Sequence, residues 1–444
     1  MYHRIMYDRQ VPVGSYWEAS AGGPVAGCDS LEGDVTADVA IIGAGYTGLS
    51  AAYHLASVDQ LDVRVLEAGA PGWGASGRNG GHCCFGGAGL EPHEIKKRFG
   101  EQVAKANIAT QRESIELVDE LATTHGFEID KHGSGELCFA HKPAAMTHLR
   151  DEAAMWKALG GFDCELMSAQ AFKERGFDGP NIHGGMLFPF GFGLHPMKYA
   201  RSLAGLALSA GAVVHSQSEV KSWSREQGVH RLHTDRGSVR ARKVLIATNG
   251  FTLDDLHPAL SGTLLPGISQ VVATRELTED ELAAHNWQTE HPLYDTRALF
   301  SYLQLTPHRR LVLGGGGGMS GSPRSSRFWE RVLRRRIATV FPEWNNVEVT
   351  HSWRGFFCLT RDRLTHIGEI DNDPGVFYSL AYHGNGVAMA TWSGRAVAGM
   401  ISGRSNARIP DSMRQPLQRF AVPALRKSDV YWRYGKRLVA DFFQ

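Results

Sequence analysis

Three glycines and one acid near the amino-terminal end form the most informative pattern in this chain. Gly43, Gly45 and Gly48 follow the pattern G-x-G-x-x-G, and Glu67 lies 19 residues after the last of them. Such glycines allow a tight turn, close approach of a pyrophosphate to the backbone, and close packing of a helix on a strand. An acid at this distance accepts hydrogen bonds from a ribose 2′-hydroxyl. The spacing therefore predicts a dinucleotide-binding site.

The elements that must position this motif surround it in the sequence. The apolar run 39–42 predicts a buried strand, residues 47–56 have the composition of a helix, and "VRVLEA" predicts a second strand that ends at Glu67. The amino terminus of the helix would offer free N–H groups and a partial positive charge to the phosphates. The complete strand–turn–helix–strand context makes the motif much more specific than a lone glycine pattern.

The next segment, "GWGASGRNGGHCCFGGAG" over residues 72–89, is rich in glycine and carries a histidine and two cysteines. Its composition is compatible with three interpretations: a flexible linker, a metal site, or a loop that lets a ligand approach the backbone. The consecutive positions of His82, Cys83 and Cys84 do not match the two-to-four-residue spacing of typical zinc ligands. Strands predicted on either side, together with Trp73 and Phe85, argue against a linker.

The rest of the chain alternates between helices and strands. Residues 101–126 predict a long amphipathic helix, and a second helix begins near Pro196, which fits a first helical turn. Strands are predicted over 134–140, 183–190 and 243–247, and residues 266–348 are strand-rich. Residues 376–403 return to strand, glycine turn and helix. We therefore predict an α+β protein of two domains, in which a sheet-rich region interrupts a Rossmann-like dinucleotide domain.

Composition bounds the class of protein. The 444 residues include 47 Lys and Arg against 46 Asp and Glu, which gives no electrostatic signature of nucleic-acid binding. No apolar run approaches the length of a transmembrane helix, and the first residues lack the apolar region of a secretory signal. The six cysteines form no Cys-x-x-Cys pair and no disulfide framework. We expect a reduced cytoplasmic protein with no bound metal.

The turn Tyr382-His383-Gly384-Asn385-Gly386, which opens a helix near the carboxyl terminus, favours a flavin over a nicotinamide cofactor. FAD is long and needs protein around both its adenine end and its ring. Helix N–H groups at this second turn would stabilise negative charge on the reduced ring.

These stretches resemble the D-amino-acid-oxidase (DAO) superfamily of FAD-dependent oxidoreductases, with their DAO/glutathione-reductase-like fold. The resemblance rests on "DVAIIGAGYTGLSAAYHLA", "VLEAGAPGWGASGRNGGH", "KVLIATNG", "WRGFFCLTRDRLTHIG" and "YSLAYHGNGVAMATWSGRAVA". Within the superfamily, "GWGASGRNGG" and "GSYWEASA" are most similar to the γ-glutamylputrescine oxidoreductase and sarcosine-oxidase-like branch. The resemblance covers residues 15–403 and assigns the segment 72–89 to the cofactor.

The resemblance implies the residues that bind FAD. Because Gly355 and Gly74 stand near the places where some relatives carry a covalent flavin link, and Cys358 is out of register, we expect the FAD to be non-covalent. The predicted cofactor-binding residues are Gly43, Gly45, Tyr46, Thr47, Gly48, Glu67, Ala68, Gly74, Ala75, Ser76, Arg78, Asn79, Gly80, Gly81, His82, Val220, Thr248, Asn249, Gly250, Gly355, His383, Gly384, Asn385, Gly386 and Val387.

The activity implied by the resemblance is oxidation of a C–N bond by hydride transfer to flavin N5, followed by hydrolysis of the imine. The substrate would be a γ-glutamyl-polyamine, an N-methyl amino acid or a D-amino acid, with O2 as acceptor giving H2O2. The alternatives are an amine dehydrogenase that passes electrons to a quinone or another carrier, and a non-catalytic redox sensor. The predicted catalytic residues are His82, His383, Tyr302 and Trp353. Each also has a purely structural interpretation, as a hydrogen-bonding, capping or packing residue.

The expected domains are discontinuous. Residues 1–100, 195–265 and 350–420 are predicted to form the FAD domain, and residues 101–194 and 266–349 the substrate domain. The basic and aromatic residues 421–444 predict a carboxyl-terminal helix, packed on the FAD domain or in contact with a membrane surface. The glycine run 314–318 is compatible with a mobile lid or a solvated turn.

Overall fold

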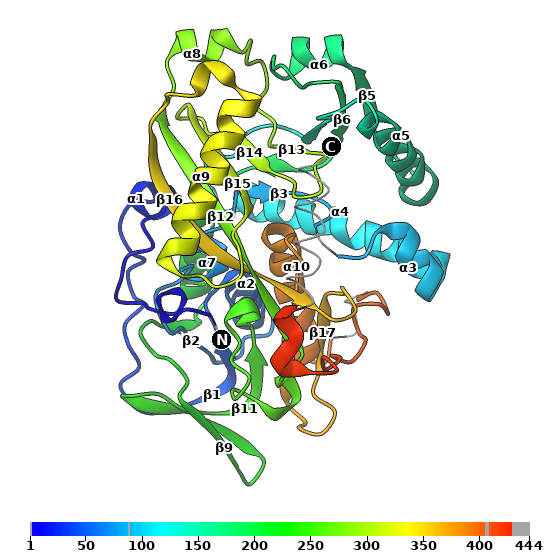
Figure 1. Cartoon of the computed structure of the whole chain (residues 1–444). Helices are drawn as coiled ribbons and strands as arrows, with labels where there is room; N and C mark the ends of the chain where they lie inside the picture. Colours follow the sequence, from blue (N-terminus) through cyan, green and yellow to red (C-terminus); the bar gives the residue numbers. More distant parts are fainter. Residues whose placement is uncertain (1, 88, 405–407, 429–444) are drawn as a thin grey trace.

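The structure is a computed structural model that describes residues 2–87, 89–404 and 408–428 (Figure 1). Two large sheets form its framework. The dinucleotide motif lies in the sheet in the lower half of Figure 1, and the strand-rich middle of the chain forms the other sheet above it. This arrangement confirms the predicted α+β class and the interrupted dinucleotide fold.

The first sheet has a parallel centre, as a dinucleotide-binding sheet requires. Its strands run in the order β17-β18-β11-β1-β2-β8, and β10 and β9 extend it from β11. Each pair of neighbouring strands from β18 to β8 is parallel. The strands are β1 (Gly33–Ile42), β2 (Val63–Leu66), β8 (Val213–His215), β9 (Ser222–Glu226), β10 (Val229–His233), β11 (Gly237–Ile246), β17 (His366–Glu369) and β18 (Val376–Leu380).

Successive residues of β1 face opposite sides of this sheet because side chains alternate along a strand. Val39 and Ile41 belong to the core beneath the helices, whereas Ala40 and Ile42 belong to a core on the other face. Both sides are buried, which explains why the run 39–42 is continuously apolar. The covering helices are α2 (Tyr46–Ser57), α4 (Glu101–Thr124), α7 (Pro196–Ser209) and α10 (Gly386–Ile401).

The second sheet is mainly antiparallel, in the order β16-β12-β15-β14-β13-β4-β6-β5. One face packs on α9 (Pro323–Val340) through a core that includes Leu303 and Leu333, and Tyr302 lies on the opposite face. The strands are β4 (Glu136–Phe139), β5 (Glu165–Ser168), β6 (Gly184–Phe188), β12 (Leu264–Glu276), β13 (Leu293–Asp295), β14 (Tyr302–Leu305), β15 (Arg310–Gly316) and β16 (Val349–Thr360).

Shorter elements complete the fold. A two-stranded ribbon joins β3 (His82–Cys83) to β7 (Phe192–Gly193). The other helices are α1 (Tyr16–Ser20), α3 (Pro92–Phe99), α5 (Ala145–Met155), α6 (Ala169–Arg175) and α8 (Glu279–Ala284), and single turns include η2 (Ala75–Gly77), η3 (Trp156–Gly160), η4 (Asn249–Phe251) and η7 (Pro423–Leu425).

Some local expectations differ from the structure. Gly314, Gly315 and Gly316 form the end of β15, paired with β12 and β14, so this part of the glycine run is neither lid nor turn. Val220, predicted to bind the cofactor, lies in the segment before β9, which begins at Ser222. The helix α4 contributes to the core of the first sheet although the sequence placed it in the substrate domain. The domain boundaries stay a prediction, and residues 429–444 of the expected terminal helix lie outside the described residues.

Candidate active site

One cavity of about 3060 Å³ brings the two sheets together around the predicted site. The carboxyl ends of β1, β2 and β11 border it, as expected for ligands of an open parallel sheet. Strands β12, β14, β15 and β16 border it from the second sheet. A cavity of this size and position can hold an extended dinucleotide and a substrate at the same time.

Most of the predicted residues line this cavity. Five do not: Gly48, Gly81, Gly250, Trp353 and Asn385 lie outside its described lining. The predicted residues that line it are Gly43, Gly45, Tyr46, Thr47, Glu67, Ala68, Gly74, Ala75, Ser76, Arg78, Asn79, Gly80, His82, Val220, Thr248, Asn249, Tyr302, Gly355, His383, Gly384, Gly386 and Val387.

The turn from β1 to α2 has the features that a pyrophosphate needs. The Tyr46 N–H, at the start of α2, donates to the Ser76 hydroxyl over 3.0 Å, so the hydroxyl proton of Ser76 can be donated to a phosphate oxygen. A Cβ atom at Gly45 would lie 2.9 Å from that same hydroxyl oxygen. The glycine therefore keeps the phosphate-facing side of the turn open.

Glu67 lies at the end of β2, buried beneath the cavity wall. Its two carboxylate oxygens accept hydrogen bonds from the Ala44 and Gly69 N–H groups over 2.8 and 2.7 Å. Burial raises the pKa of Glu67, and these two hydrogen bonds oppose that rise. Each carboxylate oxygen has a further lone pair, so Glu67 can still accept the ribose hydroxyls predicted for it.

Arg78 is a buried cation in the cavity wall whose guanidinium is only partly hydrogen-bonded. Its Nε donates to the Trp73 carbonyl over 2.7 Å, and its guanidinium lies 4.2 Å from the centre of the Trp73 ring. Only 6% of Arg78 is exposed, and its Nη2 has no hydrogen-bond partner among the described residues. Burial lowers the pKa of Arg78 to about 10, which leaves it a cation at neutral pH. The group fits a phosphate or a carbonyl oxygen of FAD.

Other side chains hold the backbone around Arg78. The indole N–H groups of Trp353 and Trp17 donate to the carbonyls of Arg78 and Asn79, each over 2.9 Å. The Asn79 amide donates to the Ser76 carbonyl and accepts from the Gly81 N–H. Trp353, predicted as catalytic, therefore lies outside the cavity lining and supports the loop that contains Arg78 and Asn79. Asn79 likewise uses its amide to shape the loop.

The second glycine turn joins β18 to α10 and contains an unusual backbone conformation. Ala381 and His383 have φ values of 66° and 53°. Residues other than glycine seldom adopt this left-handed backbone conformation. The Asn249 side chain accepts from the Ala381 N–H over 2.8 Å and so braces the turn. Gly386 begins the 16-residue helix α10 at the cavity wall. Its free N–H groups can therefore face the FAD ring.

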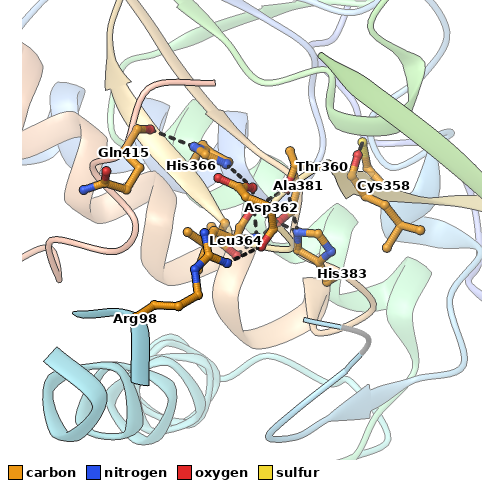
Figure 2. A network of polar contacts seen from close by, with 11 residues as sticks. Arg98, Cys358, Thr360, Asp362, Leu364, His366, Ala381, His383 and Gln415 are labelled. Atoms are coloured by element: carbon orange, nitrogen blue, oxygen red, sulfur yellow. Dashed lines mark hydrogen bonds and ion pairs between the residues drawn. The ribbon is translucent and has the colours of Figure 1, made fainter. Parts of the chain in front are cut away.

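His383 belongs to a buried polar network shown in Figure 2. Its Nε2 donates to the Leu364 carbonyl over 2.9 Å and contacts the Thr360 hydroxyl at 3.2 Å. Beside it, Asp362 pairs with His366, which also bonds the Gln415 carbonyl. Because Nε2 carries the proton, Nδ1 is an acceptor, and it has no partner within the described part of the chain. His383 can accept a hydrogen bond from a ligand in the cavity.

The neutral state of His383 has a consequence for stability. Burial lowers its pKa to about 4, whereas an unfolded histidine titrates near 6.5. Between these values the unfolded chain binds more protons than the folded one, so acidification favours unfolding. We expect the free energy of unfolding to fall between pH 6.5 and pH 4, with His383 contributing about 3 kcal/mol. Urea unfolding at several pH values measures this.

The His383→Gln variant tests the assignment, because glutamine does not titrate. Its unfolding free energy should depend less steeply on pH than that of the parent protein. A residual slope is expected from His54 and His195, whose pKa values burial lowers to about 4 and about 3. His308→Gln, at a largely exposed position, is the matched control and should retain the pH dependence that His383 confers. If the free energy of unfolding of the His383→Gln variant fell with pH as steeply as that of the parent, His383 would not be the source of this pH dependence.

His82 and Tyr302 also line the cavity and lie next to each other. Their rings meet edge to face with centroids 5.6 Å apart. The Tyr302 hydroxyl is 2.8 Å from the Ser269 hydroxyl. A Cβ at Gly80 or Gly314 would lie 2.3 or 2.1 Å from the tyrosine ring. Both glycines are therefore required by the position of Tyr302.

We call the part of the cavity around His82 and Tyr302 the second chamber, and several residues that line it carry no sequence prediction. Glu136 pairs with His82 over 2.8 Å and lines the cavity. The sequence contained a signal for Glu136, because this acid begins the otherwise apolar run "ELCF", which is buried in the structure. An acid in such a run needs a partner, since buried acids are rare without one. The aromatic residues gave no such signal. Further lining residues of the second chamber are Phe85, Glu91, Cys138, Glu152, Trp156, Phe188, Tyr294 and residues 295–300.

Cys358 is a buried free cysteine on β16, three residues after Gly355. Burial raises the pKa of Cys358 to about 12, so the thiol is a poor nucleophile. This supports the expectation of non-covalent FAD. Among the described residues, no three His, Cys, Asp or Glu side chains lie close enough to hold a metal ion. The helices of that same part of the chain include none long and apolar enough to cross a membrane.

Comparisons with known proteins agree with this geometry. The family described as "FAD dependent oxidoreductase" (DAO) matches residues 38–400. The chain is 31% identical over 390 residues to γ-glutamylputrescine oxidoreductase of Escherichia coli, which covers 88% of this chain and 89% of that protein. It is 24% identical to glycine oxidase of Geobacillus kaustophilus over 83% of this chain and 94% of the enzyme. A crystal structure of glycine oxidase from Geobacillus kaustophilus superposes with a TM-score of 0.70, at 22% identity over 87% of this chain and all of the other.

Proposed function

The chain belongs to the family of FAD-dependent oxidoreductases, and from this premise we propose that it oxidises the C–N bond of an amine to an imine, which water then hydrolyses. The family sets the cofactor and the class of reaction, on amines or amino acids. The choice of amine, the fate of the imine and the electron acceptor belong to the proposal.

The observation that carries the proposal is the continuity of the cavity. The same space is lined by Gly45 and Arg78 at its dinucleotide end and by His82, Glu136 and Tyr302 beyond it. A cofactor bound along Gly45 and Arg78 would place its reactive end next to His82, Glu136 and Tyr302. A protein that only sensed its cofactor would have no need for the second chamber.

The residues present fit FAD. Gly45, Ser76 and the amino terminus of α2 would hold the pyrophosphate, Glu67 the adenosine ribose, and the start of α10 the ring. When bound, FAD supplies the two-electron acceptor that oxidation of an amine requires. The contribution of the chain is to orient the substrate and to keep it next to that acceptor.

The walls of the second chamber suit a substrate that is part apolar and part cationic. Phe85, Trp156 and Phe188 provide aromatic surface, and Glu136 and Glu152 provide carboxylates. An alkyl chain packs on aromatic rings, and an ammonium group is attracted to both rings and carboxylates. We therefore propose a γ-glutamylated polyamine as substrate before an N-methyl amino acid or a D-amino acid, with O2 as the electron acceptor and H2O2 as product.

The test is the visible spectrum of the purified protein under argon, before and after addition of an amine panel. The panel contains γ-glutamylputrescine, sarcosine, glycine and D-alanine. We expect an oxidised-flavin spectrum that γ-glutamylputrescine bleaches and the amino acids bleach more slowly. Re-admitted air should restore the colour and release H2O2. A flavin that no amine bleaches would contradict the proposed reaction, and a bleached flavin that air leaves reduced would contradict O2 as acceptor.

A further inference from the structure

His82 and Glu136 form a buried pair in the wall of the second chamber. His82 lies on β3 and Glu136 begins β4, so two separate sheets hold the two side chains. The His82 Nδ1 is 2.8 Å from the Glu136 Oε1, and the side chains are 10% and 8% exposed. With the Glu136 oxygen as the acceptor of this bond, Nδ1 carries the proton and donates it.

This bond fixes the chemistry of the other ring nitrogen. In a neutral imidazole with a proton on Nδ1, Nε2 carries a lone pair and accepts hydrogen bonds. The Nε2 of His82 is buried and has no hydrogen-bond partner among residues 2–87, 89–404 and 408–428. Since His82 lines the cavity, the donor that this atom lacks would come from a ligand.

We propose that Nε2 of His82 accepts a proton from the substrate ammonium and that Glu136 is the positioning residue that fixes its tautomer and stabilises the resulting imidazolium. In this step an N–H bond of the ammonium breaks and an Nε2–H bond forms. The electron pair of the broken bond stays on the substrate nitrogen, and no electrons leave the substrate. The proton later passes from His82 to water. This role rests on the proposed function, because an ammonium has no lone pair to support oxidation of the adjoining C–H bond.

Among the titratable groups around the pair, Glu136 is the one that contacts a ring nitrogen of His82. His132, bridged to β7, bonds the Asp130 carbonyl through Nδ1, and burial lowers its pKa, so it stays neutral. Tyr302 on β14 bonds Ser269. Burial raises the pKa values of Cys84, Cys138 on β4, Tyr294 on β13 and Glu152 on α5.

The experiment measures the rate of flavin bleaching by substrate under argon, in the holoenzyme, from pH 6 to pH 10. At pH 7 the His82→Gln variant should react about 100-fold more slowly, the lower range for loss of a general base. At pH 10, close to the pKa of an alkylammonium group, it should approach the parent rate because neutral amine binds directly. Glu136→Gln keeps an acceptor for Nδ1–H but removes the charge, and should lose about ten-fold at pH 7.

The matched control is His285→Gln. His285 is also buried, 3% exposed, and paired with a glutamate, Glu343, over 2.9 Å, but it lies outside the cavity lining. It should leave the pH profile of the flavin-loaded enzyme unchanged. If His82→Gln lost the same fraction of its rate at every pH, His82 would have a structural role. If it lost no rate at any pH, His82 would have no role in the reaction. Either result would overturn the proposal.

A second measurement is independent of the substrate. In the resting holoenzyme with ¹⁵N-labelled histidine, the resonance that His82→Gln removes should have the shifts of a ring protonated at Nδ1 and unprotonated at Nε2. A ring protonated at Nε2 would overturn the proposal even if an amine bleaches the flavin. Failure of all amines to bleach the parent enzyme, with the expected tautomer present, would instead refute the proposed function and with it the proton transfer.

Discussion

Replacement of Gly48 by alanine is expected to abolish FAD binding and to lower the melting temperature by about 10 °C. A Cβ at this position would lie 2.0 Å from the Gly43 carbonyl oxygen and 3.2 Å from the Ile41 side chain. The nearest atom belongs to the backbone of the phosphate turn, so relief requires α2 to move away from β1. The strain corresponds to about 3 kcal/mol, the upper end of the range for overpacking. A change of this size lowers the melting temperature of a large domain by about 10 °C.

Thermal unfolding and the ratio of flavin to protein absorbance measure both effects. Gly205→Ala is the control, because Gly205 lies inside the helix α7 and a Cβ there meets no atom within 4 Å. It should raise stability by about 0.5 to 1 kcal/mol, since alanine favours a helix over glycine. A Gly48→Ala variant that purifies yellow with an unchanged melting temperature would show that α2 and β1 do not pack as closely as the structure describes.

The dinucleotide motif was predictable because its function is local in sequence. Gly43, Gly45 and Gly48 act within one turn and the elements on either side of it, and the strand and helix periods identify those elements. The long helix over residues 101–126 was predictable for the same reason, and α4 ends within two residues of that range. These features follow from patterns that a short window of sequence contains.

The features that the sequence did not reveal depend on contacts between distant segments. The glycine at position 314 was interpreted as part of a loop, yet it lies in β15. A glycine is required there because the Tyr302 ring occupies the place of a side chain. Trp353 was predicted to be catalytic, but its indole N–H supports the carbonyl of Arg78, 275 residues away. The pairing of Glu136 with His82 joins two sheets. No periodicity encodes such a partner.

The second large effect is expected at Arg78. The Arg78→Met variant keeps most of the volume of the side chain but removes its charge and its donors. We expect the dissociation constant of FAD to rise about 30- to 150-fold, which corresponds to the loss of about 2 to 3 kcal/mol for a hydrogen bond to a charged group. Fluorescence titration of the flavin-free protein with FAD gives the constant directly.

Two further variants separate the contributions of charge, geometry and global stability. Arg78→Lys keeps the charge but loses the planar group that reaches both the Trp73 carbonyl and the cavity, so it should bind FAD with intermediate affinity. Arg404→Met removes an arginine that pairs with Asp59 over 2.8 Å outside the cavity lining, and its FAD affinity should match the parent. If Arg78→Met bound FAD as tightly as the parent, the unpaired Nη2 would not face the cofactor. The buried cation would then be stabilised by the Trp73 carbonyl and by the rings of Trp73 and Phe251, contacts worth less than the cost of its burial.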